Sequence, residues 1–165
     1  MALARLIFIC NCLQALVRYE IKDFSFEAVQ QMVAYLYSGE YETEGLNLHV
    51  EIFGLAEKYD IDGLRSLSKD IFTEAVKSEE DVGNLLQCIP GVYALQSDSS
   101  QILRGNLVDA IRGRIARTPV GTGIQRFLNG IMNEVPEFAK DFVNSFVQQS
   151  SLKKCTGCGE KRKAE

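Results

Sequence analysis

The segment SFEAVQQMVAYLYSGEY, from Ser25 to Tyr41, most limits what this chain can fold into. Its apolar residues recur every three or four positions, which predicts a helix with one apolar face. Because that face is wider than the narrow contact line of a coiled coil, we expect it to pack against a protein core. Ser25 is placed to cap the start of this helix, and Gly39 to end it in a left-handed turn. The residues of the apolar face are Phe26, Val29, Met32, Val33, Tyr35 and Leu36.

Two more helices with the same spacing follow. Apolar residues from Leu48 to Tyr59 predict the first and those from Leu64 to Val76 the second, with a break at Asp60–Gly63. Helices joined by such short loops pack as antiparallel neighbours. The sequence therefore predicts a mainly α protein, an antiparallel helical bundle with a shared core. We expect that core to include Val29, Leu36, Leu55 and Leu67.

The residues after position 77 predict further short helices. Apolar stripes run through residues 82–95, 102–115 and 124–131, and a last helix begins at Pro136. Proline suits the first position of a helix, because its missing N–H costs nothing there. Phe138, Phe142 and Phe146 then follow one side of this last helix.

Two motifs, in order, resemble the signatures of one family. MVAYLYSGEY (Met32–Tyr41) resembles the YLYTGEY signature of BTB/POZ domains, and LAEKYDIDGL (Leu55–Leu64) resembles the next signature of that family, LADKYDIxxL. The resemblance covers about residues 20–76, the back half of a BTB domain. It implies the back half of a BTB/POZ fold plus a helical extension. It also implies that the front half, a three-stranded sheet and the first helices, is missing.

A looser resemblance extends to fungal BTB proteins, which follow the domain with a helical extension and a Cys-x-x-Cys-Gly tail. We therefore predict four parts. These are an apolar N-terminal segment (1–19), a partial BTB/POZ domain (20–77), a helical extension (78–149) and a disordered, basic tail (150–165). We expect disorder in the tail because it is short, charged and terminal.

The apolar N-terminal segment leaves two alternatives open. It is too short to span a bilayer, which takes about 20 apolar residues. One alternative is a buried amphipathic helix or strand that covers the helices behind it. The other is a secretory signal, because the basic Arg5 precedes a short apolar core.

Composition narrows the class of protein. With 46% hydrophobic and 24% charged residues, the chain of 165 residues is typical of a globular protein. A net charge of −4 argues against nucleic acid as the main partner, because that surface needs clustered Lys and Arg. Five cysteines without a regular spacing indicate reduced thiols. We therefore expect an intracellular protein, cytoplasmic or nuclear, that does not bind a membrane.

The chain lacks the sequence pattern of an active site. Its single histidine, His49, stands in no catalytic or metal-binding motif, and we expect a structural or capping role for it. The acidic cluster Glu79–Asp81 lies at a predicted helix start, where the helix dipole favours negative charge. Cys88 fits a core position. We therefore expect no enzyme activity.

Cys155 and Cys158 form the strongest metal-like feature. Two thiolates spaced in this way can hold one side of a tetrahedral zinc ion, but zinc needs four ligands. Cys10 and Cys12 are a poor second pair, because only one residue separates them. We therefore expect no cofactor, with zinc held between two chains as the alternative. The basic residues around the pair also fit a nuclear import signal.

The resemblance implies a protein–protein interaction module. Its partners would be a second BTB domain or a cullin, which the family contacts through helices equivalent to residues 26–41 and 48–59. Two alternatives remain: a small zinc-binding or thiol protein that acts through Cys155 and Cys158, and a non-functional BTB fragment. The candidate partner-binding residues, each of which also fits a core position, are Tyr35, Tyr37, Tyr41, Phe53 and Tyr59.

Overall fold

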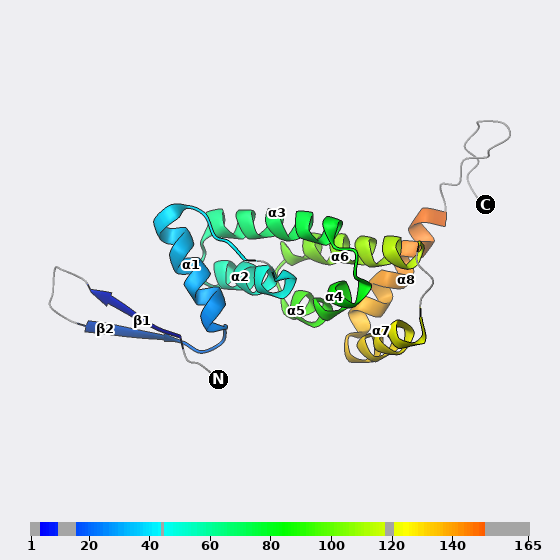
Figure 1. Cartoon of the computed structure of the whole chain (residues 1–165), viewed down its shortest axis with the longest axis horizontal. Coiled ribbons are helices and arrows are strands. Elements are labelled where there is room, and N and C mark those ends of the chain that lie inside the picture. Colours follow the sequence, from blue (N-terminus) through cyan, green and yellow to red (C-terminus); the bar gives the residue numbers. More distant parts are fainter. Residues whose placement is uncertain (1–3, 10–15, 44, 118–120, 151–165) are drawn as a thin grey trace, which may run out of the picture. The chain divides into compact units, whose positions relative to one another are not determined.

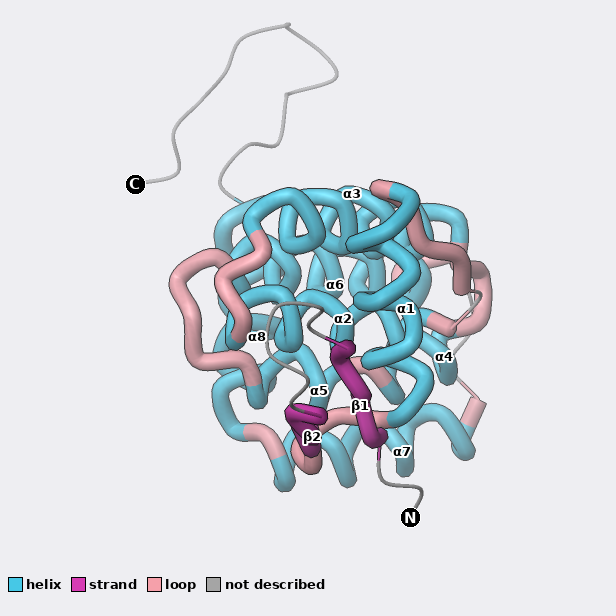
Figure 2. Tube along the Cα trace, turned by 90° about the vertical axis from the view of Figure 1, so that its left-hand side faces the viewer, coloured by secondary structure: helices cyan, strands magenta, loops and turns pink. Residues whose placement is uncertain are grey.

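The computed structural model describes residues 4–9, 16–43, 45–117 and 121–150. The chain forms two compact units, residues 1–72 and 73–165. Helices dominate both units, and Figure 2 also shows two strands, which belong to the first unit. The prediction of a mainly α fold is confirmed. The elements in chain order are β1 (Ala4–Ile9), β2 (Leu16–Ile21), α1 (Phe26–Ser38), α2 (Leu46–Lys58), α3 (Asp62–Ser78), α4 (Val82–Gln87), α5 (Ile89–Ala94), α6 (Ser100–Ile115), α7 (Thr122–Glu134) and α8 (Pro136–Ser150).

The strands β1 and β2 form an antiparallel pair in the first unit, with Ala4 opposite Ile21 (Figure 1). Residues 4–9 and 16–21 are thus extended, while the burial that was predicted for the apolar N-terminal segment lies outside what the structure describes. Ile21, the last residue of β2, is buried in the core of the first unit. The strand pair therefore ends at the helical core.

The two ends of α1 are fixed as the sequence predicts. The Ser25 side chain accepts a hydrogen bond from the Ala28 backbone N–H over 3.2 Å. At the other end, Gly39 has a φ of 78° and donates its N–H to the Tyr35 carbonyl oxygen over 2.8 Å. A side chain at this φ would be strained, so glycine is the residue that ends the helix here.

A hydrophobic core of the first unit is formed by α1, α2, α3 and the end of β2. Val29 and Leu55 are buried in it and Leu67 packs against it, so these three predictions are confirmed. The buried residues of this core are Ile21, Ala28, Val29, Met32, Tyr41, Ile52, Leu55, Ala56 and Leu64.

Two predicted core residues of α1 are instead exposed. Leu36 and Phe26 are each more than half exposed, so their assignment to the core was wrong. Leu36 lies in the last turn of α1, and residues 36–40 are all exposed. The part of α1 that packs against the core therefore ends before Leu36. Phe26 precedes the buried Ala28 by two residues, which places it about 200° away around the helix.

In the second unit, α6 packs against α4, α5 and α8, and α7 packs against α8. The interior is apolar and includes Leu85, Leu103 and Phe138, and Cys88 is buried there as predicted. Arg114 of α6 is also buried; it donates from Nε to the Glu79 carbonyl oxygen (2.8 Å) and from Nη2 to the Lys77 carbonyl oxygen (2.7 Å). These two bonds satisfy carbonyl groups that the end of α3 leaves without a helical partner.

Candidate partner-binding surface

The five predicted partner-binding residues do not form one surface. Phe53 is fully buried and Tyr41 is almost so; both lie in the interior, the alternative that the sequence left open. Tyr35 and Tyr59 are half-buried and pack against the core of the first unit. Tyr37 alone of the five is exposed, with 88% of its surface accessible.

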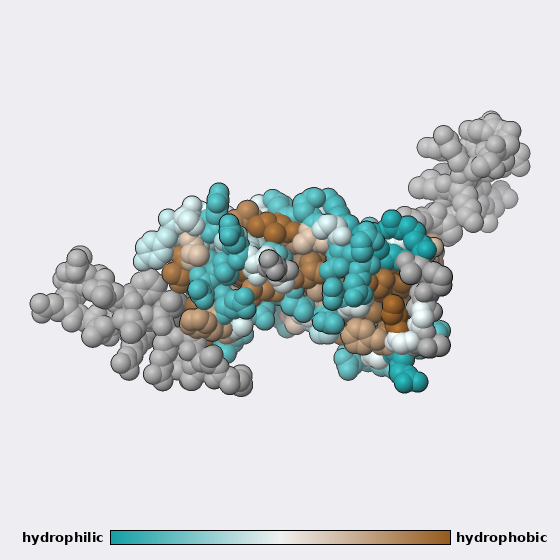
Figure 3. Space-filling model, in the orientation of Figure 1, coloured by the Kyte–Doolittle hydropathy of each residue, from teal (hydrophilic) through white to brown (hydrophobic). Residues whose placement is uncertain are grey.

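Tyr37 belongs to a larger apolar surface, which we call the outer face of α1. It consists of Phe26, Val33, Leu36 and Tyr37. On a helix of 3.6 residues per turn, Phe26, Val33 and Tyr37 fall within about 40° of one another, and Leu36 borders them on the side of the core. Figure 3 shows apolar side chains exposed over α1. The helix is therefore apolar on two sides, and the core of the first unit covers one of them.

Carboxylates gather at the starts of α1 and α2. Glu27, Glu42 and Glu51 help to line a hollow of about 560 Å³ at the starts of α1 and α2. Glu51 accepts hydrogen bonds from the backbone and the hydroxyl of Ser25, so it ties the start of α1 to α2. At short range, three carboxylates favour a partner that carries Lys or Arg.

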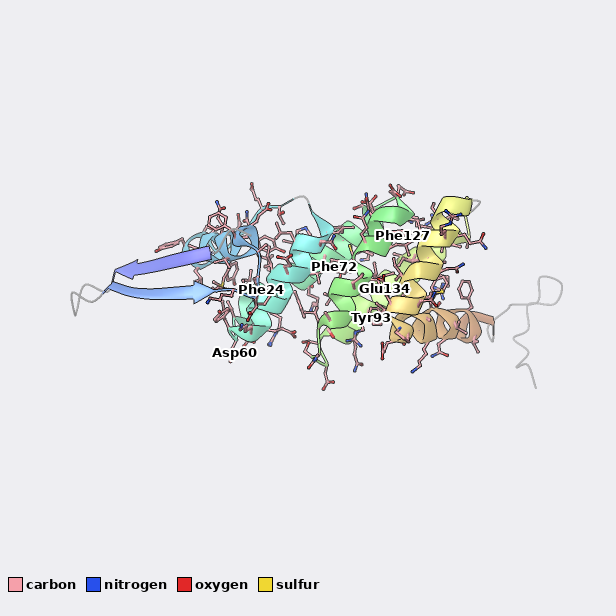
Figure 4. The ribbon with its side chains drawn as sticks, turned by 90° about the horizontal axis from the view of Figure 1, so that it is seen from below. Phe24, Asp60, Phe72, Tyr93, Phe127 and Glu134 are labelled. Atoms are coloured by element: carbon pink, nitrogen blue, oxygen red, sulfur yellow. The ribbon has the colours of Figure 1, made fainter. Side chains whose placement is uncertain are left out.

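A small cluster surrounds Lys58 in the last turn of α2. This residue forms an ion pair with Asp23, which lowers the pKa of that carboxyl through the hydrogen bond and the charge of Lys58. The Lys58 ammonium also lies 5.6 Å from the ring centre of Phe24 and 5.9 Å from that of Tyr59. Phe24 lies just before α1 (Figure 4). Tyr59 also packs against the core of the first unit.

His49 has a structural role. The ring is buried, and its Nδ1 lies 2.9 Å from the hydroxyl oxygen of Tyr41, which is also buried. Desolvation lowers the pKa of His49 and raises that of Tyr41, so both groups are neutral at pH 7. The neutral imidazole can then accept the hydroxyl proton of Tyr41 in a hydrogen bond. This pair fixes the turn after α1 to α2.

The zinc alternative rests on Cys155 and Cys158, which lie outside the described residues, as do Cys10 and Cys12. Within the described part of the chain, no three His, Cys, Asp or Glu side chains are grouped so that they could hold a metal ion. Over the same residues, no helix has the length and hydropathy that crossing a bilayer requires.

The chain matches the family model of the BTB/POZ domain over residues 7–75. This match begins earlier than the motifs, which cover the chain only from about residue 20, and it includes β2 and the second half of β1. It also includes the whole outer face of α1. No curated protein and no solved structure matches the chain.

Proposed function

We propose, because residues 7–75 belong to the BTB/POZ domain family, that this chain acts by binding a partner protein on the outer face of α1. BTB/POZ domains mediate dimerisation and binding to other proteins. The observation that carries the proposal is the exposure of Phe26, Leu36 and Tyr37 together on the matched domain. Exposed apolar side chains that share one helix face are typical of interaction sites.

The chemistry of this surface describes the partner. Tyr37 provides a large aromatic side chain that a partner can bury, and aromatic residues of this kind often dominate binding energy. The carboxylates of Glu27, Glu42 and Glu51 lie at the start of α1. The partner therefore presents apolar side chains flanked by Lys or Arg, and raised salt should slow the association.

Among partners of the family, we propose a cullin, so that the chain is an adaptor of a cullin-type ubiquitin ligase. What supports this choice is the resemblance, since the family contacts cullins through helices that include the equivalent of α1. A second BTB domain is the competing partner. This role requires no reaction at the chain itself, which agrees with the lack of a catalytic motif in the sequence.

The proposal is tested by calorimetric titration of the full chain with a purified cullin N-terminal domain. Tyr37→Ala should weaken binding about tenfold or more, because truncation of an aromatic residue at the centre of an interface costs about 2 kcal/mol. The matched control is Ile102→Ala, at an apolar residue of α6 that is 54% exposed and lies outside the matched domain. Absence of binding to the unmodified chain would refute the cullin proposal. Equal affinities for the two variants would refute the assignment to α1.

A further inference from the structure

A polar hollow lies between α6 and α8 in the second unit. Its volume is about 490 Å³, and small-molecule sites in proteins typically have volumes of about 300–1,000 Å³. The side chains that line it include three charged groups, those of Arg104, Asp109 and Asp141, and the amides of Gln101 and Asn144. Such a lining suits a polar, charged ligand.

Arg104 of α6 has hydrogen-bond donors that the second unit does not use. Its Nη2 donates to the carbonyl oxygens of Tyr93 (3.4 Å) and Leu95 (2.5 Å). Its Nε is buried without a hydrogen-bond partner, and its Nη1 forms no hydrogen bond with the residues that the structure describes. Buried donors in proteins are nearly always satisfied, so Arg104 indicates an acceptor that a ligand supplies. A carboxylate has the geometry that fits a guanidinium group.

Tyr93 of α5 places an opposite charge at the same end of the hollow. The Arg104 Cζ lies 4.8 Å from the centre of the Tyr93 ring, and the Tyr93 hydroxyl donates to Oδ2 of Asp141 over 2.8 Å. Tyr93 (Figure 4) is itself held edge-on against the buried Phe138, with ring centres 5.9 Å apart. One ring therefore fixes a cation and an anion together. The carboxylate and the ammonium group that a free amino acid carries on one carbon atom match this pair of charges.

The other end of the hollow carries a second carboxylate, that of Asp109. Its Oδ1 is paired with Arg112 over 2.9 Å, and Arg112 also donates to the Ser145 carbonyl oxygen over 2.6 Å. The Asp109 side chain is 66% exposed, so it can accept a second cation. Asp109 follows Arg104 by five residues, which is about 7.5 Å along the axis of α6. The extended side chain of lysine or arginine can span this distance.

The charge and the shape of the hollow favour the same ligand. One positive and two negative side chains line it, a net charge of −1, and free lysine and arginine carry +1 at pH 7. Gly105 belongs to the lining, and a Cβ atom there would meet nothing within 4 Å. Packing thus does not require glycine at this position, although glycine inside a helix lowers its stability. Its missing side chain leaves space for a ligand.

From these features, we propose that the hollow between α6 and α8 binds one molecule of a basic amino acid, with L-arginine as the probe. The α-carboxylate of the ligand binds Arg104, its α-ammonium group binds Asp141, and its side-chain cation binds Asp109. The site lies in the second unit, outside the matched BTB/POZ domain, and it does not depend on the partner proposed for α1.

The test is an NMR titration of the full chain with L-arginine at pH 7. We expect saturable shifts, largest at the amide signals of Gly105 and Asn144, with a Kd of about 1 mM or below. L-citrulline has a similar shape and an uncharged side chain. N-acetyl-L-arginine amide lacks both main-chain charges. Each should bind at least about tenfold more weakly, because each loses charged hydrogen bonds. No saturable shift up to about 10 mM L-arginine, or equal binding of either compound, would overturn the proposal.

Two pairs of variants locate the site. Asp141→Asn keeps an oxygen that can accept from Tyr93 but removes the charge, so it should raise the Kd at least about tenfold. Its control is Glu134→Gln, at an exposed carboxylate of α7, which should change the Kd less than about twofold. Gly105→Leu should fill the hollow and abolish binding, whereas Gly130→Leu should not, although a Cβ atom at Gly130 also meets nothing within 4 Å. Equal thermal melting within each pair shows that the variants fold. Equal affinities within either pair would exclude this hollow as the site.

Discussion

The contact between Tyr35 and Gly63 offers a sharp test of how α1 and α3 share their core. A Cβ atom added at Gly63 would overlap the hydroxyl oxygen of Tyr35, while its distance to the Tyr35 Cζ would be 3.4 Å. The overlap thus concerns the hydroxyl group alone. Gly63→Ala should therefore force the half-buried Tyr35 ring away from its position, whereas Gly63→Ala with Tyr35→Phe should leave the ring in place.

Two opposing effects set the magnitude. Alanine in place of glycine in a helix stabilises by up to about 1 kcal/mol. An overpacked contact costs about 1–3 kcal/mol. Gly63→Ala alone should then lower the free energy of unfolding by about 0.5–2 kcal/mol. In the Tyr35→Phe background the same change should raise it by about 0.5–1 kcal/mol, so the coupling energy between the two positions is about 1–3 kcal/mol.

The assay is urea unfolding, followed by circular dichroism, of all four proteins in the double-mutant cycle. Their free energies of unfolding can be compared when the slope of free energy against urea concentration is the same for all four. Gly105→Ala is the matched control, since a Cβ atom there would meet nothing within 4 Å and α6 should gain about 0.5–1 kcal/mol. A coupling energy below about 0.5 kcal/mol, with Gly63→Ala as stabilising as Gly105→Ala, would show that Tyr35 does not lie against α3.

Three further predictions concern buried polar groups. Arg114→Met should lower the free energy of unfolding in urea by about 2–3 kcal/mol, because two carbonyl oxygens at the end of α3 lose their donor. The same change at the exposed Arg117 should cost less than about 0.5 kcal/mol. Equal costs of the two changes would contradict the role of Arg114. Burial lowers the pKa of His49, so the unfolded chain takes up a proton there at a higher pH than the folded chain. The free energy of unfolding should therefore be highest above about pH 6.5 and should fall below that pH. His49→Gln should remove this dependence in equilibrium unfolding measured from about pH 7.5 to 5. Burial raises the pKa of Cys88 to about 12, so mass-spectrometric mapping after thiol alkylation at pH 8 should find Cys88 labelled in urea and unlabelled in the native protein; rapid native labelling would contradict its burial.

Local features of the fold could be predicted because they depend on neighbours in the sequence. The Ser25 cap, the left-handed Gly39 and Pro136 at the start of α8 each follow from the chemistry of one residue at a helix end. Periodicity likewise predicts α1 and places Val29 in the core.

The side of α1 that faces the core could not be predicted fully, because α1 is apolar on two sides. Periodicity alone placed Phe26 and Leu36 in the interior, and both are exposed. The same ambiguity affects the candidate site. A tyrosine in the motif is buried or exposed according to which helix covers it, so Tyr41 and Tyr37 have opposite positions. The hydrogen bond between Tyr41 and His49 joins two elements, and spacing along the chain gives no signal for it.

The most direct test of the proposed function is site-specific photocrosslinking of the full chain to a purified cullin N-terminal domain. A photoreactive phenylalanine analogue would replace Tyr37 in one protein and the exposed Ile102 in another. We predict crosslinks from position 37 to the cullin domain and none from position 102. Crosslinks from position 102 alone, or from neither position while the two proteins form a complex, would contradict the assignment of the outer face of α1 as the partner-binding surface.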